Sequence, residues 1–119
     1  MSSVIPEELS AGEKVLREKI RENLRLILKT GKLKFGFRNI IRALQRGQAK
    51  MIILAKNIPA EKRVLIQYLC AISNVPMIIF PGTVKELGES CGRPHIISSI
   101  AIIDPGTSDV LKLGHVPAL

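Results

Sequence analysis

Short runs of uninterrupted apolar residues constrain the fold of this chain more than any other feature of its sequence. Met51–Ala55, Met77–Phe80 and residues 100–103 are of strand length and apolar on both faces, which is the pattern of strands buried between two layers. Residues 33–35 are a fourth, shorter strand candidate. Because segments of helical length separate these runs, the sequence predicts an α/β fold, a three-layer α/β/α sandwich around a four-stranded mixed sheet.

The segments between the apolar runs carry the start and stop signals of helices. Ser10 with Glu13, and Thr83 with Glu86, match the capping box, in which a hydroxyl and a carboxylate satisfy free amides at a helix start. Gly31 is predicted to end the first helix in a left-handed conformation. The side chains expected to face the core are Val15, Leu16, Ile20, Leu24, Ile27 and Leu28 in the first helix, Ile40, Ile41 and Leu44 in the second, and Val64, Leu65, Tyr68, Leu69 and Ile72 in the third.

The length of 119 residues supports one domain, and a chain of this size buries about two-thirds of the surface that it exposes when unfolded. We expect an N-terminal arm over residues 1–10, which has two acids and no base, followed by a single domain over 11–119. No apolar run approaches the roughly 18 residues of a membrane span, and the acidic start matches neither a signal nor a transit peptide. Cys70 and Cys91 are expected to be free thiols of an intracellular protein.

The charge is concentrated in one part of the chain. The net charge is +8, and residues 23–60 hold nine bases and no acid. Within this stretch Arg38, Arg42 and Arg46 are spaced by four, so they lie along one side of a helix. An ordinary solvated helix face is the alternative, but such a face normally intersperses acids with its bases. The pattern favours a basic surface that meets a polyanion such as a nucleic acid, and an aromatic content of 3% excludes a platform of stacked aromatics.

Enzyme chemistry finds few of its usual ingredients. The two histidines, His95 and His115, lie in different segments, and there is no paired-carboxylate cluster or metal-ligand spacing. Cys91 and His95 are four residues apart, but the Gly-Arg-Pro between them disfavours a helical pairing of thiol and base. No phosphate-binding loop motif occurs. Gly36 lies at a strand-to-helix junction, which could bind a phosphate or form only a tight turn. We therefore expect no catalytic residue, no metal and no cofactor.

Chain topology predicts where three loops meet. In an open α/β sheet the loops that follow parallel strands gather at one end of the sheet. Residues 35–38 and 56–59 are two such loops. If the last strand is antiparallel, the loop before it, residues 92–95, reaches the same end of the sheet. Amide, guanidinium and apolar groups together suit unpaired RNA bases and their phosphates. The residues expected at this end of the sheet are Phe35, Gly36, Arg38, Asn57, Arg93, His95 and Ile97.

An ordered set of short motifs runs through most of the chain. They are Thr30-Gly-Lys32, Phe35-Gly-Phe-Arg38, Leu44-Gln-Arg-Gly47, Ala49-Lys-Met-Ile-Ile-Leu-Ala55, Asn57-Ile-Pro59, Glu86-Leu-Gly88, Gly92-Arg-Pro-His95 and Asp104-Pro-Gly-Thr-Ser-Asp109. In this order they resemble the archaeal and eukaryotic large-subunit ribosomal proteins numbered thirty, a family of kink-turn RNA binders. The resemblance implies that 11–119 is one kink-turn RNA-binding domain. It also implies a non-enzymatic role in the large subunit of the cytoplasmic ribosome. The implied partners are rRNA and other large-subunit proteins, without membrane or small-molecule substrate.

The resemblance also implies roles for individual residues. It assigns RNA contact to the first loop, base reading to Asn57, a basic contact to Lys62 and an apolar contact to Ile97. The N-terminal arm is more acidic and longer than the family pattern, and His95 stands where some relatives have an aromatic residue. The full set of residues expected to bind RNA is Lys34, Phe35, Gly36, Phe37, Arg38, Arg42, Asn57, Lys62, Gly92, Arg93, Pro94, His95 and Ile97.

Two alternatives remain open at the level of sequence. A related kink-turn binder of a small ribonucleoprotein or of a recoding complex would share the same loops. A small nucleotide-binding or thiol enzyme would instead use Gly36 or Cys91.

Overall fold

The computed structural model describes residues 11–92 and 95–117, so the predicted N-terminal arm and the cap residue Ser10 lie outside the described residues. Helices and strands alternate along the chain as the apolar runs predicted. The elements are α1 (Ala11–Thr30), β1 (Lys32–Phe35), α2 (Phe37–Gln45), β2 (Met51–Ala55), α3 (Ala60–Ser73), β3 (Met77–Phe80), α4 (Val84–Ser90), β4 (Ser99–Asp104) and the 3-10 helix η1 (Val110–Leu113).

The four strands form one mixed sheet in the order β1-β4-β2-β3. β4 runs antiparallel to both of its neighbours, β1 and β2, whereas β2 and β3 are parallel. The sheet is therefore mixed, as predicted. In this topology β1, β2 and β3 all run toward one end of the sheet, which is the end where β4 begins.

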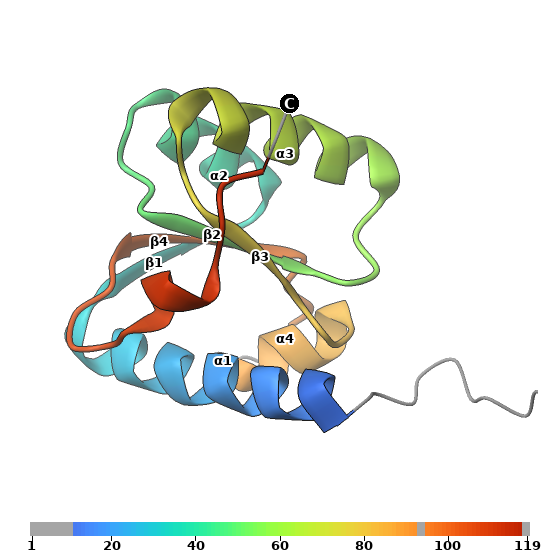
Figure 1. Ribbon diagram of the computed structural model, residues 1–119, viewed down its shortest axis with the longest axis vertical. Coiled ribbons are helices and arrows are strands. Elements are labelled where there is room, and N and C mark those ends of the chain that lie inside the picture. The colour runs from blue at the N-terminus through green and yellow to red at the C-terminus, as the bar shows by residue number, and fades with distance from the viewer. Residues whose placement is uncertain (1–10, 93–94, 118–119) are drawn as a thin grey trace, which may run out of the picture.

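Helices cover both faces of the sheet and complete the three-layer sandwich (Figure 1). α1 and α4 lie on one face and α2 and α3 on the other, and each pair encloses its own apolar cluster. Every residue of β2 is buried because its side chains alternate between the two clusters. Ile20, Leu24 and Ile27 of α1 enter one cluster, and Ile40 and Leu44 of α2 enter the other. Val15 and Leu28, which were expected in the core, are exposed because they lie at the margins of the α1 stripe.

Two glycine and capping predictions had different outcomes. The Thr83 capping box is confirmed, since the Thr83 hydroxyl accepts from the Glu86 amide at 3.2 Å and the Glu86 carboxylate accepts from the Thr83 amide at 3.2 Å. Gly31 does follow the last residue of α1, but it has no positive φ. Glycine is needed there because a Cβ would collide with the carbonyl oxygen of Asp104.

The core-facing side of α3 was predicted wrongly. Val64, Leu65, Tyr68 and Ile72 are between 42% and 59% exposed, and the buried residues are Ile66 and Cys70. Only Leu69 of the predicted stripe packs against the core. Because α3 is apolar on more than one side, its sequence contains two apolar stripes offset by about one residue. Periodicity alone cannot decide which of them faces the sheet.

The last described residues pack back against the sheet. η1 places Val110 in the cluster beneath α1, and His115 then pairs with Met77 at the outer edge of β3. The Met77 amide donates to the His115 carbonyl at 2.9 Å, and the His115 amide donates to the Met77 carbonyl at 3.2 Å. This bridge covers part of an otherwise open sheet edge.

Candidate nucleic-acid interface

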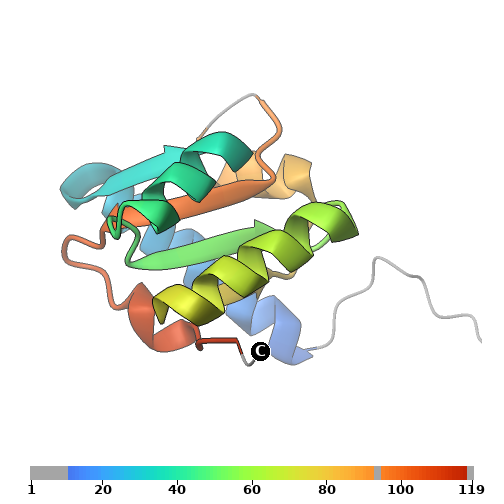
Figure 2. The same cartoon turned by 90° about the horizontal axis from the view of Figure 1, so that it is seen from above.

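Three loops meet at one end of the sheet, which lies to the right in Figure 2. They follow β1, follow β2 and precede β4, and they come together because β4 runs antiparallel to β1 and β2, which was the condition for their convergence. Backbone hydrogen bonds join them, because the Gly36 amide donates to Ser99 at 3.4 Å and the Ala55 amide donates to Ser98 at 2.9 Å. The site is thus built on the ends of paired strands, so its parts have fixed relative positions.

Gly36 connects the end of β1 directly to the start of α2. Its φ of 91° lies in the region that side chains disfavour, and no atom would contact a Cβ added there. Glycine is therefore required for the backbone conformation and not for space inside the protein. The turn is held from both sides, since the Ile40 amide donates to the Gly36 carbonyl at 3.0 Å and the Asn39 side chain donates to the Phe35 carbonyl at 2.9 Å.

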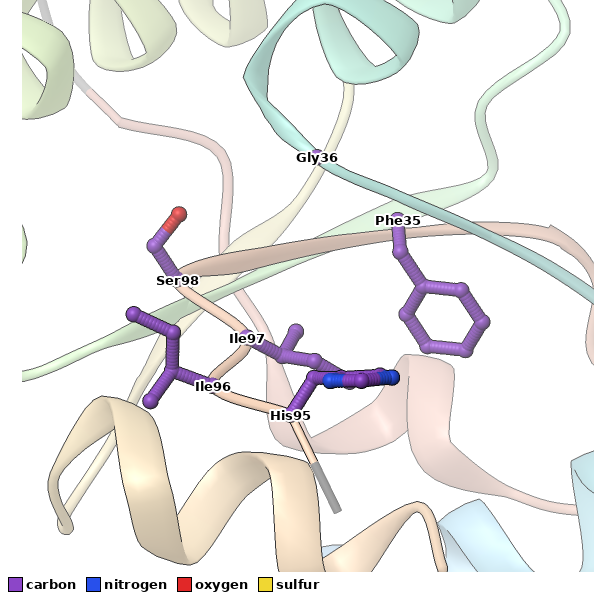
Figure 3. Close-up of a pocket in the computed structure, with 6 residues that line it drawn as sticks. All are labelled: Phe35, Gly36, His95, Ile96, Ile97 and Ser98. Atoms are coloured by element: carbon purple, nitrogen blue, oxygen red, sulfur yellow. The ribbon is translucent and has the colours of Figure 1, made fainter. Parts of the chain in front are cut away.

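A pocket of about 260 Å³ opens between the first and third loops. The Phe35 ring and the His95 imidazole both project into this region, and Ile97 also lines it (Figure 3). Ile97 is almost fully buried, whereas His95 is exposed. An apolar floor beside an exposed heteroaromatic ring suits a flat group that has one apolar face and a polar edge. The residues that line the pocket are Phe35, Gly36, His95, Ile96, Ile97 and Ser98.

Two of these lining residues, Ile96 and Ser98, were missed from the sequence. Ile96 is 71% exposed, the highest value among the exposed large apolar side chains of the described residues. The missed signal was the run of isoleucines itself. In an extended segment successive side chains alternate, so a buried Ile97 places Ile96 outward.

Asn57 of the second loop is oriented by the protein. Its side-chain oxygen accepts a hydrogen bond from the Val84 amide, at the first residue of α4, at 3.0 Å. This bond assigns the oxygen and nitrogen of the amide, which geometry alone often cannot distinguish. In the part of the chain that the structure describes, the amide nitrogen has no hydrogen-bond partner. Asn57 therefore presents donors to a ligand, because its acceptor is already used within the protein.

Basic side chains border the loops on the side of α2 and α3. The Lys62 ammonium lies 5.3 Å from the centre of the Phe37 ring, a cation–π contact that joins the starts of the two helices. Arg38 and Arg42 line a groove of about 410 Å³ between α2 and α3. Lys34 is set apart from the pocket, because on β1 its side chain alternates with that of Phe35 and is exposed on the opposite face of the sheet.

The third loop is described only in part. Gly92 follows α4 with a φ of 68°, and its amide donates to the Glu89 carbonyl at 2.9 Å, which ends the helix. His95 returns toward the sheet, and its carbonyl lies so close to Gly88 that a Cβ at that position would collide with it. The predicted contacts Arg93 and Pro94 lie outside the described residues.

The thiols are poorly placed for nucleophilic chemistry. Both cysteines are buried thiols outside any disulfide, and burial raises the pKa of the Cys70 thiol to about 12. Cys91 belongs to the apolar cluster under α1, whereas His95 is exposed at the pocket. Among the described residues, no cluster of His, Cys, Asp and Glu is suited to hold a metal ion. No described helix is both long enough and apolar enough to span a membrane.

Comparison with known proteins gives a consistent result. Residues 18–112 match the model of the Ribosomal protein L7Ae/L30e/S12e/Gadd45 family. The chain is 38% identical over 94 residues to the large ribosomal subunit protein eL30 of Methanopyrus kandleri, a match that covers 79% of this chain and 86% of the relative. It is 42% identical to the eL30 of Pyrobaculum neutrophilum, with 79% and 93% covered. Identity to the eL30 of Tetrahymena thermophila is 34%, with 84% and 96% covered.

Proposed function

We infer the function from one premise, that the chain belongs to the Ribosomal protein L7Ae/L30e/S12e/Gadd45 family. We propose that it is a non-enzymatic, structural protein of the large subunit of the cytoplasmic ribosome. In this role it binds kinked rRNA through the three loops and contacts neighbouring large-subunit proteins. Relatives from two archaea and a ciliate carry the same large-subunit name, which favours this assignment over a small ribonucleoprotein or a recoding complex.

The observation that carries the proposal is the pocket between Phe35 and His95, at the point where the loops converge. A sharply bent RNA displaces bases from the helical stack, and proteins recognise such bases by stacking and by hydrogen bonds to their edges. The pocket offers an apolar floor and a ring for one displaced base. Asn57 offers N–H donors to a base edge nearby, and the exposed backbone of Gly36 allows the RNA strand to approach closely.

The basic residues supply affinity that does not depend on sequence. Arg38 and Arg42 on α2 and Lys62 on α3 flank the loops, where they can neutralise the phosphates on either side of the bend. A thiol enzyme is disfavoured, because the Cys70 thiol stays protonated at neutral pH and Cys91 is buried.

The proposal is tested in two independent ways. In a filter-binding titration the protein should bind a hairpin with a kink-turn at least tenfold more tightly than a fully paired duplex of the same length. Equal affinity for both RNAs would contradict recognition through the loops. In a sucrose gradient of a cell extract the protein should migrate with large ribosomal subunits. Its complete absence from those fractions would contradict the ribosomal role.

A further inference from the structure

A second group of basic residues lies at the end of the sheet opposite the three loops. We propose that this group is a separate contact for the phosphate backbone of double-stranded RNA. The group consists of Lys32, Arg46 and Lys50, and we call it the distal cluster. All three side chains are exposed. This inference rests on the proposed function, which it extends from one contact with RNA to two.

The topology brings these residues together. Lys32 begins β1 and is the cross-strand partner of Asp104 at the end of β4. Lys50 immediately precedes β2 on the other side of β4, and its amide donates to the Ile102 carbonyl at 2.7 Å. Because β4 alone separates β1 from β2, the backbones of Lys32 and Lys50 lie about 10 Å apart.

Arg46 lies at the same end of the sheet, on the helix α2 that covers one face. It is the C-cap of α2, and Gly47 then reverses the chain with a φ of 68°. The Gln48 amide donates to the Ala43 carbonyl at 2.9 Å, which holds the connection to β2 against the end of the helix. The distal cluster thus stands on two strand ends and a helix end joined by backbone hydrogen bonds, so the backbones of its three residues have fixed relative positions.

None of the three cations forms an ion pair with a described acid. On β1 the exposed Lys32 alternates with Leu33, which packs toward α1. The carboxylate of Asp104, the cross-strand partner of Lys32, accepts from the Gly106 amide at 2.9 Å. Among the described residues the ion pairs are Arg17 with Glu86 and Arg21 with Glu18, so no described acid pairs with the cluster. Neighbouring cations without ion pairs repel one another unless a polyanion neutralises them.

The distal cluster is too far from the pocket to serve the same nucleotides. Four strand residues separate Gly36 from the start of β1, which corresponds to about 13 Å along an extended chain. That distance is on the order of four phosphate spacings along one strand of a duplex. The exposed row of Arg38, Arg42 and Arg46 on α2 joins the two ends. The phosphates at the distal cluster therefore come from an extended arm of the kinked RNA or from a second RNA segment.

The test uses the full-length protein, a distal variant (Lys32→Gln, Arg46→Gln, Lys50→Gln) and a control variant (Lys14→Gln, Arg25→Gln, Lys29→Gln). The control removes the same charge from exposed positions of α1, on the other side of the sheet. Three ligands are titrated at about 0.15 M salt: a kinked hairpin with short arms, the same hairpin with long arms, and a labelled duplex added to protein saturated with the short-armed hairpin.

We expect the distal variant to bind the short-armed hairpin within about twofold of the control variant. On the long-armed hairpin or on the added duplex it should lose roughly 10- to 100-fold, with a salt slope lower by about three. A loss on the long arm assigns the contact to the kinked RNA itself, and a loss on the added duplex assigns it to a second segment.

Equal behaviour of the distal and control variants on every RNA would overturn the inference. Polyglutamate binding that depends on the distal cluster as strongly as duplex binding would overturn it too, in favour of an acidic protein partner. Failure of the proposed function has a different signature. The wild-type protein would then bind the kinked hairpin no better than a plain duplex, while plain-duplex binding would still separate the distal from the control variant if the inference holds.

Discussion

Replacing Asn57 by aspartate separates the two tasks that this side chain performs. The oxygen of Asn57 accepts from the Val84 amide at 3.0 Å, and the nitrogen is left as the proposed donor to RNA. Asn57→Asp keeps an oxygen acceptor for Val84 but replaces the donors with a second acceptor that carries a negative charge. Asn57→Ala removes both groups and adds no charge. The pair of variants therefore tests donation to a base apart from the support of α4.

The magnitudes follow from this geometry. A base-edge contact through a side-chain amide is worth about 1–3 kcal/mol by analogy with groove recognition, which corresponds to roughly 5- to 160-fold in affinity. Both variants should lose at least this much on kinked RNA. The free energy of unfolding should stay within about 0.5 kcal/mol for Asn57→Asp. It should fall by about 1 kcal/mol for Asn57→Ala, because the hydrogen bond to Val84 is lost.

Filter binding to a kinked hairpin and to a paired duplex, together with urea unfolding, measures all of these quantities. Affinity for the duplex should change little in Asn57→Ala, since the phosphate contacts remain. If Asn57→Asp bound the kinked hairpin as tightly as the wild type, Asn57 would not donate to a base. A loss in Asn57→Asp alone, with Asn57→Ala unchanged, would attribute the effect to charge repulsion and equally refute the donor role.

Three further predictions concern the stability of the fold. Thr83→Ala should lower the free energy of unfolding by about 0.5–2 kcal/mol in urea because it removes the capping box of α4, and Thr83→Ser should restore most of it. Ile66→Ala should cost about 2–5 kcal/mol and Leu65→Ala less than about 0.5 kcal/mol, and the reverse order would place the wrong side of α3 in the core. Burial raises the pKa of Cys70 to about 12, so between about pH 9 and 12 this thiol ionises only in the unfolded chain. The free energy of unfolding should therefore fall as pH rises through this range, by up to about 1.4 kcal/mol per pH unit. Cys70→Ala should remove this component of the pH dependence.

The sequence predicted the sheet well because strand burial leaves a strong signal. A run such as Met51–Ala55, apolar at every position, fits a strand covered on both faces, and it is the central, fully buried β2. The convergence of the loops was conditional on an antiparallel β4, and the structure meets that condition. The family resemblance found in the ordered motifs is also confirmed, by the family match over residues 18–112.

Packing details were harder to predict because they depend on neighbours that are distant in the sequence. α3 has two apolar stripes, and the choice of Ile66 over Leu65 is made by the sheet that the helix covers. Gly31 was assigned to a left-handed turn, yet its constraint is the carbonyl of Asp104, more than seventy residues away. At the candidate site, the bond between Asn57 and Val84 joins the second loop to α4, so the presented donors could not be inferred from Asn57 alone.

The placement of the few aromatic residues bears on how the chain would discriminate among RNAs in the proposed function. Phe80 is buried in the core and Tyr68 is exposed on α3, whereas Phe35 and Phe37 flank Gly36 in the first loop. A single ring at the pocket can stack on one base but not on a succession of bases. We therefore expect selectivity to depend on an RNA that already presents a displaced base, while the cations of α2 and the distal cluster hold the flanking phosphates. Raising the salt concentration should accordingly weaken binding to kinked and straight RNA with similar slopes and leave the preference between them nearly unchanged.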